Sequence, residues 1–235
     1  MPYQLICLDL DGTLVDTAPE IAHAANRALA LHGLPVRTQA DITLLIGAGA
    51  HALLRRLLHD AAPASQVSSE AVLASFEASY AALAGTLCRP YPACALALQQ
   101  LRDAGVRLAC VTNKELRHAT RVLQATGLAQ FFDLVLGGDS LPEKKPHASV
   151  LRHAAATLGV PLRYTAHVGD SSTDVLAARN AGVAAWAVPY GYNGGMPVAD
   201  CGPDRVFDDL AQVAAHVLAS GGDGHGKSEP KKSIV

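Results

Sequence analysis

Four aspartates stand where two apolar segments of the sequence end, in the runs DLDGTL and GDSSTD. Asp9 and Asp11 are two residues apart at the end of an extended segment, a spacing that points both side chains to one side. Asp170 ends the second segment, and Asp174 lies four residues on, on the same face of an expected helix. Four carboxylates in one pocket repel one another without a cation, so a hard divalent ion, in the first place Mg²⁺, is expected there.

Groups that suit a substrate anion follow other apolar segments. Thr112 and Asn113 end the run VRLACVTN and supply a hydroxyl, an amide and backbone N–H groups. Lys144 or Lys145, in the run EKKP, supplies a positive charge for an anion that approaches the aspartates. A metal ion, a lysine and hydrogen-bond donors together indicate a phosphate site.

The elements that must position these groups alternate between strand and helix. Short continuous apolar runs, typical of strands buried on both faces, are YQLICLDL, VRLACVT, FDLVLGG, YTAHVGD and VAAWAVP. Segments with helical spacing, each closed by a glycine, are Ala93 to Ala104, Glu115 to Thr126, His147 to Leu158 and Thr173 to Ala181. This alternation predicts an α/β fold with a doubly wound, Rossmann-like parallel sheet, in which ligands bind beyond the carboxyl ends of the strands.

The first half of the chain interrupts this alternation with several helical patterns and no convincing strand. We therefore expect an α/β core made of residues 1–16 and 88–220, and a helical insertion at residues 17–87. Thr17 and Glu20 have the spacing of a capping box at the start of the first inserted helix. Residues 221–235 are rich in Gly, Lys and Ser and are expected to form a flexible tail.

The composition disfavours several classes of function. Nineteen Lys and Arg against 21 Asp and Glu give a formal charge of -2, and with few aromatic residues this makes nucleic acid an unexpected partner. The N-terminus lacks a signal pattern and no apolar run approaches about 18 residues, so we expect neither export nor a membrane span. Five widely spaced cysteines without a CxxC pattern favour free thiols in a cytoplasmic protein. The sequence favours neither a monomer nor a homodimer.

Two motif matches fail on their context. The run GGDGHGKS at residues 221–228 fits the phosphate-loop pattern, but no strand precedes it and seven residues follow it. The run DLDGTLVDTAPE places oxygen ligands at EF-hand positions, but Leu14 occupies the sixth position, where the calcium loop needs glycine. We therefore expect neither nucleotide binding nor an EF-hand.

The runs DLDGTLVD, VTNK, KKP and GDSSTD, in this order and with a helical insertion after the first, resemble the haloacid dehalogenase superfamily of phosphohydrolases. Within it, TLVDTAPEI, IGAGA, VTNKE and YGYNGG resemble the phosphoglycolate phosphatase family. The resemblance implies a Rossmann-like core with a helical cap. It also implies hydrolysis of a small phosphorylated metabolite, first of all 2-phosphoglycolate, through an aspartyl-phosphate intermediate.

The resemblance assigns a role to each aspartate. Asp9 would be the nucleophile, and Asp11 would protonate the leaving alcohol and then activate water. Mg²⁺ would be held by the side chains of Asp9 and Asp170 and by the backbone carbonyl of Asp11. Asp174 would support the metal shell or the lysine.

The resemblance also places five residues around the phosphate. Its oxygens would lie beside Gly12, Thr13, Thr112 and the N–H of Asn113. Lys145, the lysine directly before the proline, would neutralise the charge that develops during transfer.

In the insertion, the loop Gly47, Ala48 and Gly49 precedes a helical pattern, and its backbone N–H groups would face a substrate carboxylate. Arg55 and Arg56 lie on that helix beside leucines, where at least one of them is expected to be solvated.

Other polar residues near the motifs are expected to be structural. Lys144 is interpreted as a solvated neighbour of the catalytic lysine, and Lys114 either contacts the substrate or points to the insertion. His167, inside a strand, is expected to be a hydrogen-bonded core residue, Ser171 a helix cap, and Asp16 a structural or hinge residue.

Three alternatives stay open at this point. The first is another small phosphorylated substrate in place of 2-phosphoglycolate, namely a sugar phosphate, pyridoxal phosphate or pyrophosphate. A sugar phosphomutase would return the phosphate from the aspartate to a sugar, and only the insertion would distinguish it. A non-catalytic metal-binding or phosphate-binding protein is disfavoured, because both Asp9 and Asp11 are present.

Overall fold

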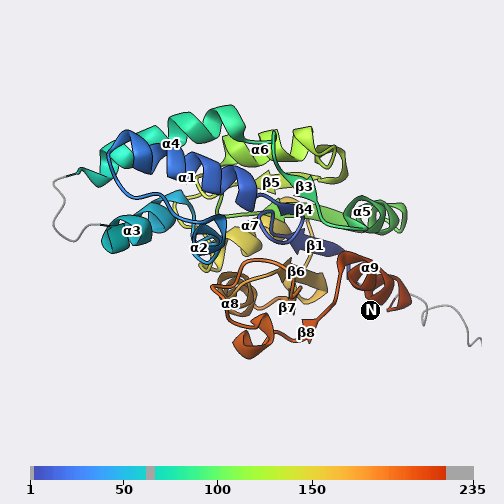
Figure 1. The fold of residues 1–235 in the computed structure, drawn as a ribbon. Helices are drawn as coiled ribbons and strands as arrows, with labels where there is room; N and C mark the ends of the chain where they lie inside the picture. Colours follow the sequence, from blue (N-terminus) through green and yellow to red (C-terminus); the bar gives the residue numbers. More distant parts are fainter. Residues whose placement is uncertain (1–2, 62–66, 221–235) are drawn as a thin grey trace, which may run out of the picture.

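Six parallel strands form the centre of the molecule in the computed structural model, which describes residues 3–61 and 67–220 (Figure 1). Their order in the sheet is β5-β4-β1-β6-β7-β8. Their bounds are β1 Leu5–Leu8, β4 Arg107–Val111, β5 Leu134–Leu136, β6 Thr165–Gly169, β7 Ala184–Ala187 and β8 Arg205–Val206. Because β1 lies between β4 and β6, the order of strands reverses beside it. The predicted doubly wound α/β fold is confirmed.

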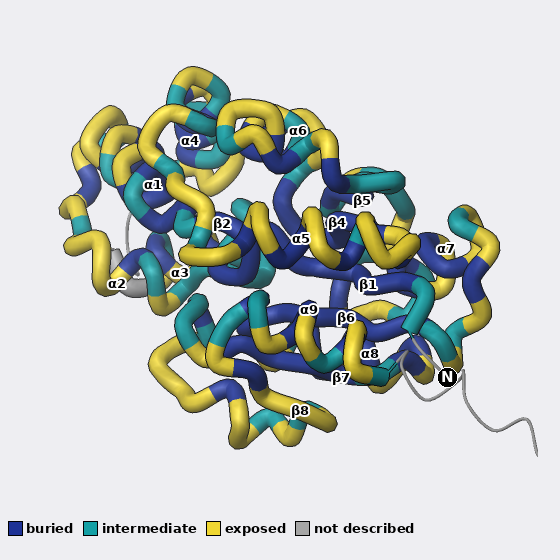
Figure 2. Tube along the Cα trace, turned by 90° about the vertical axis from the view of Figure 1, so that its right-hand side faces the viewer, coloured by how far each residue is buried: buried dark blue, intermediate teal, exposed yellow. Residues whose placement is uncertain are grey.

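Helices cover both faces of this sheet, which explains why β1 is apolar at every position. Ile6 and Leu8 pack on one face, together with the apolar sides of α5, α6 and α9. Leu5 and Cys7 pack on the other face, against α7 and α8. The bounds are α5 Cys94–Asp103, α6 Leu116–Ala125, α7 Ser149–Thr157, α8 Ser172–Ala181 and α9 Leu210–Ala219, with short 3-10 turns at η1 Ala129–Phe131, η2 Leu162–Tyr164 and η3 Val198–Cys201. Figure 2 shows the buried strands between helices whose outer sides are exposed.

In the described part of the chain, four helices lie between two short strands that pair antiparallel, β2 Val15–Asp16 and β3 Arg89–Pro90. The helices are α1 Ala18–Leu31, α2 Gln39–Thr43, α3 Ala50–Ala61 and α4 Ser69–Leu83. They gather at one end of the molecule, where α1 and α4 run side by side (Figure 1). Apolar residues of α1, α3 and α4 belong to the same buried cluster as one face of the sheet. The helices therefore pack on the sheet as one continuous core.

The capping box predicted at the start of α1 is wrong. The hydroxyl of Thr17 donates to the carboxylate of Asp11 at 2.6 Å and does not cap the helix. Glu20 is fully buried, and its carboxylate accepts bonds from the Tyr80 hydroxyl at 2.7 Å and the Gly85 N–H at 3.0 Å. Tertiary partners satisfy Glu20 better than a local cap, because a buried carboxylate needs several donors.

Three other expectations concern the chain as a whole. Within residues 3–61 and 67–220, no helix is long and apolar enough to cross a membrane. All five cysteines are free, as predicted, and Cys7, Cys94 and Cys110 are buried. The expected tail at residues 221–235, with its phosphate-loop match, lies outside the described residues.

Candidate active site

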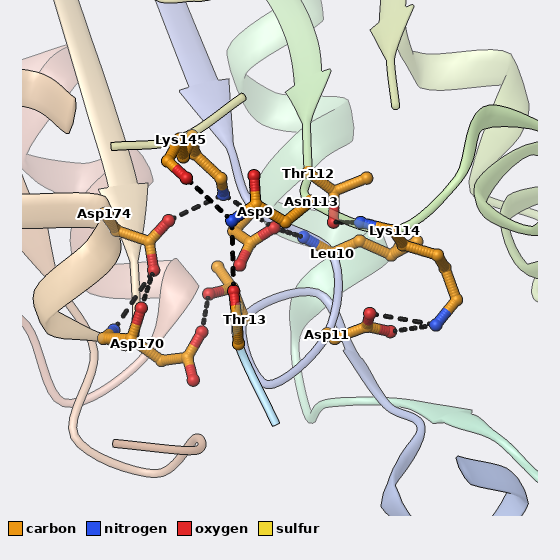
Figure 3. A network of polar contacts seen from close by, with 12 residues as sticks. Asp9, Leu10, Asp11, Thr13, Thr112, Asn113, Lys114, Lys145, Asp170 and Asp174 are labelled. Atoms are coloured by element: carbon orange, nitrogen blue, oxygen red, sulfur yellow. Dashed lines mark hydrogen bonds and ion pairs between the residues drawn. The ribbon is translucent and has the colours of Figure 1, made fainter. Parts of the chain in front are cut away.

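The loops after β1, β4 and β6 meet at the carboxyl edge of the sheet (Figure 3). Asp9 follows β1, Thr112 follows β4 and Asp170 follows β6. These three strands are neighbours in the sheet, so their loops are brought together although the sequence separates them widely. The predicted convergence of the motifs at one edge is therefore present.

Three buried carboxylates form the centre of the site. One oxygen from each of Asp9, Asp170 and Asp174 lies within 4.8 Å of the others. The Nζ atom of Lys145 lies 2.9 Å from Asp9 and 2.7 Å from Asp174, and its side chain is 1% exposed. Lys145 pairs with two of the three acids and leaves Asp170 without a cation, so this donor set fits a hard divalent cation.

Burial and charge set the protonation of this cluster. Burial raises the pKa of Asp170 well above its usual range, and the neighbouring charges of Asp174 and Asp9 raise it further. Burial also raises the pKa of Asp9, although Lys145 opposes the shift. Burial acts on Asp174 in the same direction, but Lys145 and His167 outweigh it and hold that pKa well below its usual range. Burial by itself would lower the pKa of Lys145, yet the two carboxylates raise it. Lys145 and Asp174 thus form a charged pair, while Asp9 and Asp170 are the acids that a cation would stabilise.

Neighbouring donors hold the two aspartates of the second motif. The Thr13 hydroxyl donates to Asp170 at 2.7 Å, and the Ser171 hydroxyl donates to Asp174 at 2.6 Å. The ring of His167 lies between the Cys7 carbonyl, 3.2 Å from Nδ1, and Asp174, 3.1 Å from Nε2. His167 is a hydrogen-bonded core residue, as predicted, and it also orients a carboxylate of the site.

Two glycines make room for these carboxylates. Gly12 has a φ of +88°, and a Cβ atom there would lie 2.4 Å from an Asp170 oxygen. A Cβ atom on Gly169 would lie 2.1 Å from the Asp174 carboxyl carbon. Any side chain at either position would displace an aspartate.

Asp11 does not join the other three carboxylates, which corrects the expected cluster of four. Its side chain turns to Lys114, whose Nζ atom lies 2.9 Å from both carboxylate oxygens (Figure 3). The Thr17 hydroxyl donates to the same carboxylate. A separate cation therefore satisfies Asp11 and removes the repulsion that would act within a group of four acids.

Thr112 and Asn113 are both buried beside the aspartates. The Asn113 side-chain amide donates to the Lys145 carbonyl at 3.0 Å and to the Gly47 carbonyl at 3.2 Å. The amide thereby links the loop that carries the lysine to the inserted helices. Its oxygen has no hydrogen-bond partner among the described residues.

A cavity lies in front of Asp9, between the sheet edge and the inserted helices. Its cavity volume is about 60 Å³. Its polar lining is Asp9, Asp11, Thr112, Asn113, Lys114, Glu77, Glu115 and His118, and its apolar lining is Ile21, Ile46, Ala50, Leu53, Phe76 and Tyr80. Gly47 and Gly49 also line it. The space suits a small polar molecule whose reacting end meets Asp9.

A family model described as haloacid dehalogenase-like hydrolase matches residues 3–182. The chain belongs to the haloacid dehalogenase-like hydrolases. A phosphoglycolate phosphatase of Cupriavidus necator is 41% identical over 215 residues, which cover 92% of this chain and 93% of the relative. The resemblance inferred from the motifs is confirmed, and this hydrolase is a phosphatase.

Solved structures of similar chains share its fold. A predicted phosphoglycolate phosphatase from Haemophilus somnus is 34% identical with a TM-score of 0.87, and the match covers 91% of this hydrolase and 97% of that chain. CbbY from Rhodobacter sphaeroides, solved in complex with phosphate, is 26% identical with a TM-score of 0.76, over 90% and 96% of the two chains. Proteins of this kind act on small phosphorylated molecules.

Some residues of the hydrolase do not lie where the sequence predicts. Lys144 is half-buried and donates to the Ala48 carbonyl at 3.0 Å, so it holds the inserted loop and is not simply solvated. Arg55 and Arg56, by contrast, are both exposed, which agrees with the expectation that at least one is solvated, and neither lines the cavity in front of Asp9. Ala48 does not line that cavity either, unlike the glycines on each side of it.

Sequence reasoning missed Tyr192 of the hydrolase. Its backbone N–H donates to Asp170, and its hydroxyl contacts Asp16 and accepts bonds from the N–H groups of Thr17 and Ala18. Tyr192 therefore ties the Asp170 loop to the segment where the helical insertion begins. The signal was a tyrosine in the glycine-rich run YGYNGG, a pattern that indicates no chemistry by itself.

Proposed function

We propose that this phosphatase is a Mg²⁺-dependent phosphomonoester hydrolase that forms an aspartyl-phosphate on Asp9, and that its substrate is 2-phosphoglycolate. The observation that carries the proposal is the group of three buried carboxylates with one lysine, beside a small cavity that Asp9 lines. The 41% identity to a phosphoglycolate phosphatase supports the choice of substrate.

In the first step, an oxygen of Asp9 bonds to phosphorus while the bond from phosphorus to the alcohol oxygen breaks. Lys145 and the Leu10 N–H, 2.9 and 2.7 Å away, contact Oδ1 of Asp9, so Oδ2 is the attacking oxygen. Asp11 gives a proton to the leaving alcohol. It then takes a proton from the water whose oxygen attacks phosphorus and releases phosphate and Asp9.

The remaining site residues hold the phosphate and the metal. The carboxylates of Asp9 and Asp170 and the backbone carbonyl of Asp11 would hold Mg²⁺. When bound, this ion neutralises the acids and polarises the phosphoryl oxygens. Asp174 supports the site through Lys145.

The phosphate oxygens would meet hydrogen-bond donors on two loops. Gly12 and Thr13 supply the loop after β1, and Thr112 and the Asn113 N–H supply the loop after β4. Lys145, which contacts Oδ1 of Asp9, stabilises with its charge the phosphoryl group during transfer.

Residues 17–87 would act as a cap over a core of residues 1–16 and 88–220. The apolar cavity wall that α1, α3 and α4 supply would exclude bulk water during transfer. The loop of Gly47, Ala48 and Gly49 would border the substrate. Free thiols favour a cytoplasmic setting for this activity.

Phosphate release with and without Mg²⁺ tests the proposed function. The panel holds 2-phosphoglycolate, pyridoxal phosphate, several sugar phosphates and pyrophosphate. We expect Mg²⁺-dependent release with a preference for 2-phosphoglycolate of at least about tenfold in kcat/KM. A broad pattern of release would remove the specific substrate, and no release from any ester would favour a mutase or a binding protein.

Removal of divalent cations should destabilise the protein more strongly as the pH rises. Because the pKa of Asp170 is raised, the folded protein keeps a proton that the unfolded chain loses above about pH 4. Stability without metal therefore falls as the pH rises from about 4 toward the folded pKa, and a cation that replaces the proton restores it. We expect the increase in Tm caused by Mg²⁺ over EDTA to be larger near pH 8 than near pH 5. An equal increase at both pH values would contradict a metal at these carboxylates.

A further inference from the structure

Lys114 is a buried cation that lines the cavity, whereas Lys145 does not. The Lys114 side chain is 6% exposed, and its Nζ atom lies 2.9 Å from both carboxylate oxygens of Asp11. The same atom lies 4.7 Å from the centre of the Tyr80 ring on α4. The core thus supplies a charge that an aromatic ring of the inserted helices covers.

The ring over Lys114 is held firmly in place. The Tyr80 hydroxyl donates to Glu20, which is fully buried and also accepts a bond from the Gly85 N–H. Phe76 stacks on the same ring with centroids 5.6 Å apart. Lys114 is therefore set in a rigid pocket, where its Nζ atom has a fixed place.

The charges around the cavity favour one position for a second anionic group of the substrate. Among the described residues that line it, Lys114 is the only lysine or arginine. The two acids farther along the wall already have a cationic partner, because Arg117 contacts both Glu77 and Glu115. Apart from Lys114, the acids, Thr112, Asn113 and His118, the remaining lining is apolar or glycine. A substrate that places its phosphate at Asp9 therefore finds one cation for a further negative charge.

We propose that Lys114 is the specificity residue that binds the carboxylate of the substrate, in the place that the Asp11 carboxylate occupies in this structure. The inference rests on the proposed function and names the residue that reads the acid group. The pair of Lys114 with Asp11 shows that the pocket accepts a carboxylate with two contacts of 2.9 Å. On binding, the substrate carboxylate takes the place of the Asp11 carboxylate, which is the same chemical group.

This exchange couples recognition to catalysis. When the substrate carboxylate takes Lys114, Asp11 loses that partner, keeps its bond from the Thr17 hydroxyl and is free to meet the leaving oxygen. An ester without a carboxylate leaves the buried pair of Asp11 and Lys114 intact, because nothing replaces the partner of the lysine. Esters with and without a carboxylate should therefore differ in kcat as well as in KM.

The experiment compares 2-phosphoglycolate with ethyl phosphate, which has the same chain length and no carboxylate. In the Lys114→Met variant, kcat/KM for 2-phosphoglycolate should fall about a hundredfold or more, and that for ethyl phosphate less than about tenfold. Lys114→Arg should restore part of the preference, since it keeps the charge. Arg27→Met removes an exposed cation of α1 and should leave both values unchanged.

Inhibition constants show that the variants keep an intact site. Inorganic phosphate should inhibit Lys114→Met as it inhibits the wild type, whereas inhibition by glycolate should be lost. The Lys114→Gln variant is made in parallel, because the glutamine amide can still donate to Asp11. It takes the place of Lys114→Met if the methionine variant does not fold. The same loss of preference is expected for it.

The outcomes separate this inference from the proposed function. A wild type that hydrolyses ethyl phosphate as well as 2-phosphoglycolate would overturn the proposed substrate. A wild-type preference that survives in Lys114→Met and Lys114→Gln would overturn the role of Lys114 alone. An equal loss for both esters would also overturn it, since Lys114 would then only position Asp11.

Discussion

The Asp9→Asn variant should lose at least about 10⁴-fold in kcat while it still binds inorganic phosphate. The asparagine keeps the shape of the aspartate, and its oxygen can take the place near Lys145 and the Leu10 N–H that Oδ1 holds now. The amide nitrogen then stands where the attacking oxygen should be. It offers no lone pair for phosphorus, so the aspartyl-phosphate does not form.

Stability gives this variant an independent readout. Burial raises the pKa of Asp9, so a neutral amide there costs little and relieves repulsion from Asp174 and Asp11. We expect an unchanged or higher Tm in EDTA, together with the loss of turnover in Mg²⁺. Asp103→Asn, an exposed aspartate on α5, serves as the matched control and should keep full activity. Undiminished turnover of Asp9→Asn would exclude the aspartyl-phosphate mechanism.

The Lys145→Met variant should lose both activity and stability. Lys145 is the buried cation between Asp9 and Asp174, and its removal leaves Asp174 without its main partner. Breaking a buried pair on one side costs about 3–5 kcal/mol in the free energy of unfolding. Loss of the charge beside the transferring phosphate should lower kcat by about 10³-fold.

Urea unfolding and a double-mutant cycle test this assignment. Adding Asp174→Asn to Lys145→Met removes the unpaired acid, so the double variant should be more stable than the sum of the single changes by about 1–3 kcal/mol. Lys144→Met, which removes one hydrogen bond to the Ala48 carbonyl, should cost about 1 kcal/mol. If Lys145→Met unfolds as the wild type does, Lys145 is not paired with these acids in solution.

The sequence by itself determined the sheet and the place of the motifs. A strand buried on both faces must be apolar throughout, so the continuous apolar run that contains β1 predicts a buried strand. The glycines that follow the helical patterns predict where the helices end. The chemistry-bearing residues come directly after such strands. Parallel strands bring those positions to one edge whatever the details of packing, and this is why Asp9, Thr112 and Asp170 could be grouped in advance.

Only the tertiary structure decided which buried charged side chains pair with one another. Asp11 and Lys114 are 103 residues apart, Tyr80 and Glu20 are 60 apart, and their contacts depend on how the inserted helices pack on the core. No local pattern encodes such pairs, because each buried charge takes whichever partner the assembled fold offers. For this reason the sequence predicted four carboxylates in one pocket, whereas the fold groups three of them and gives Asp11 a lysine of its own.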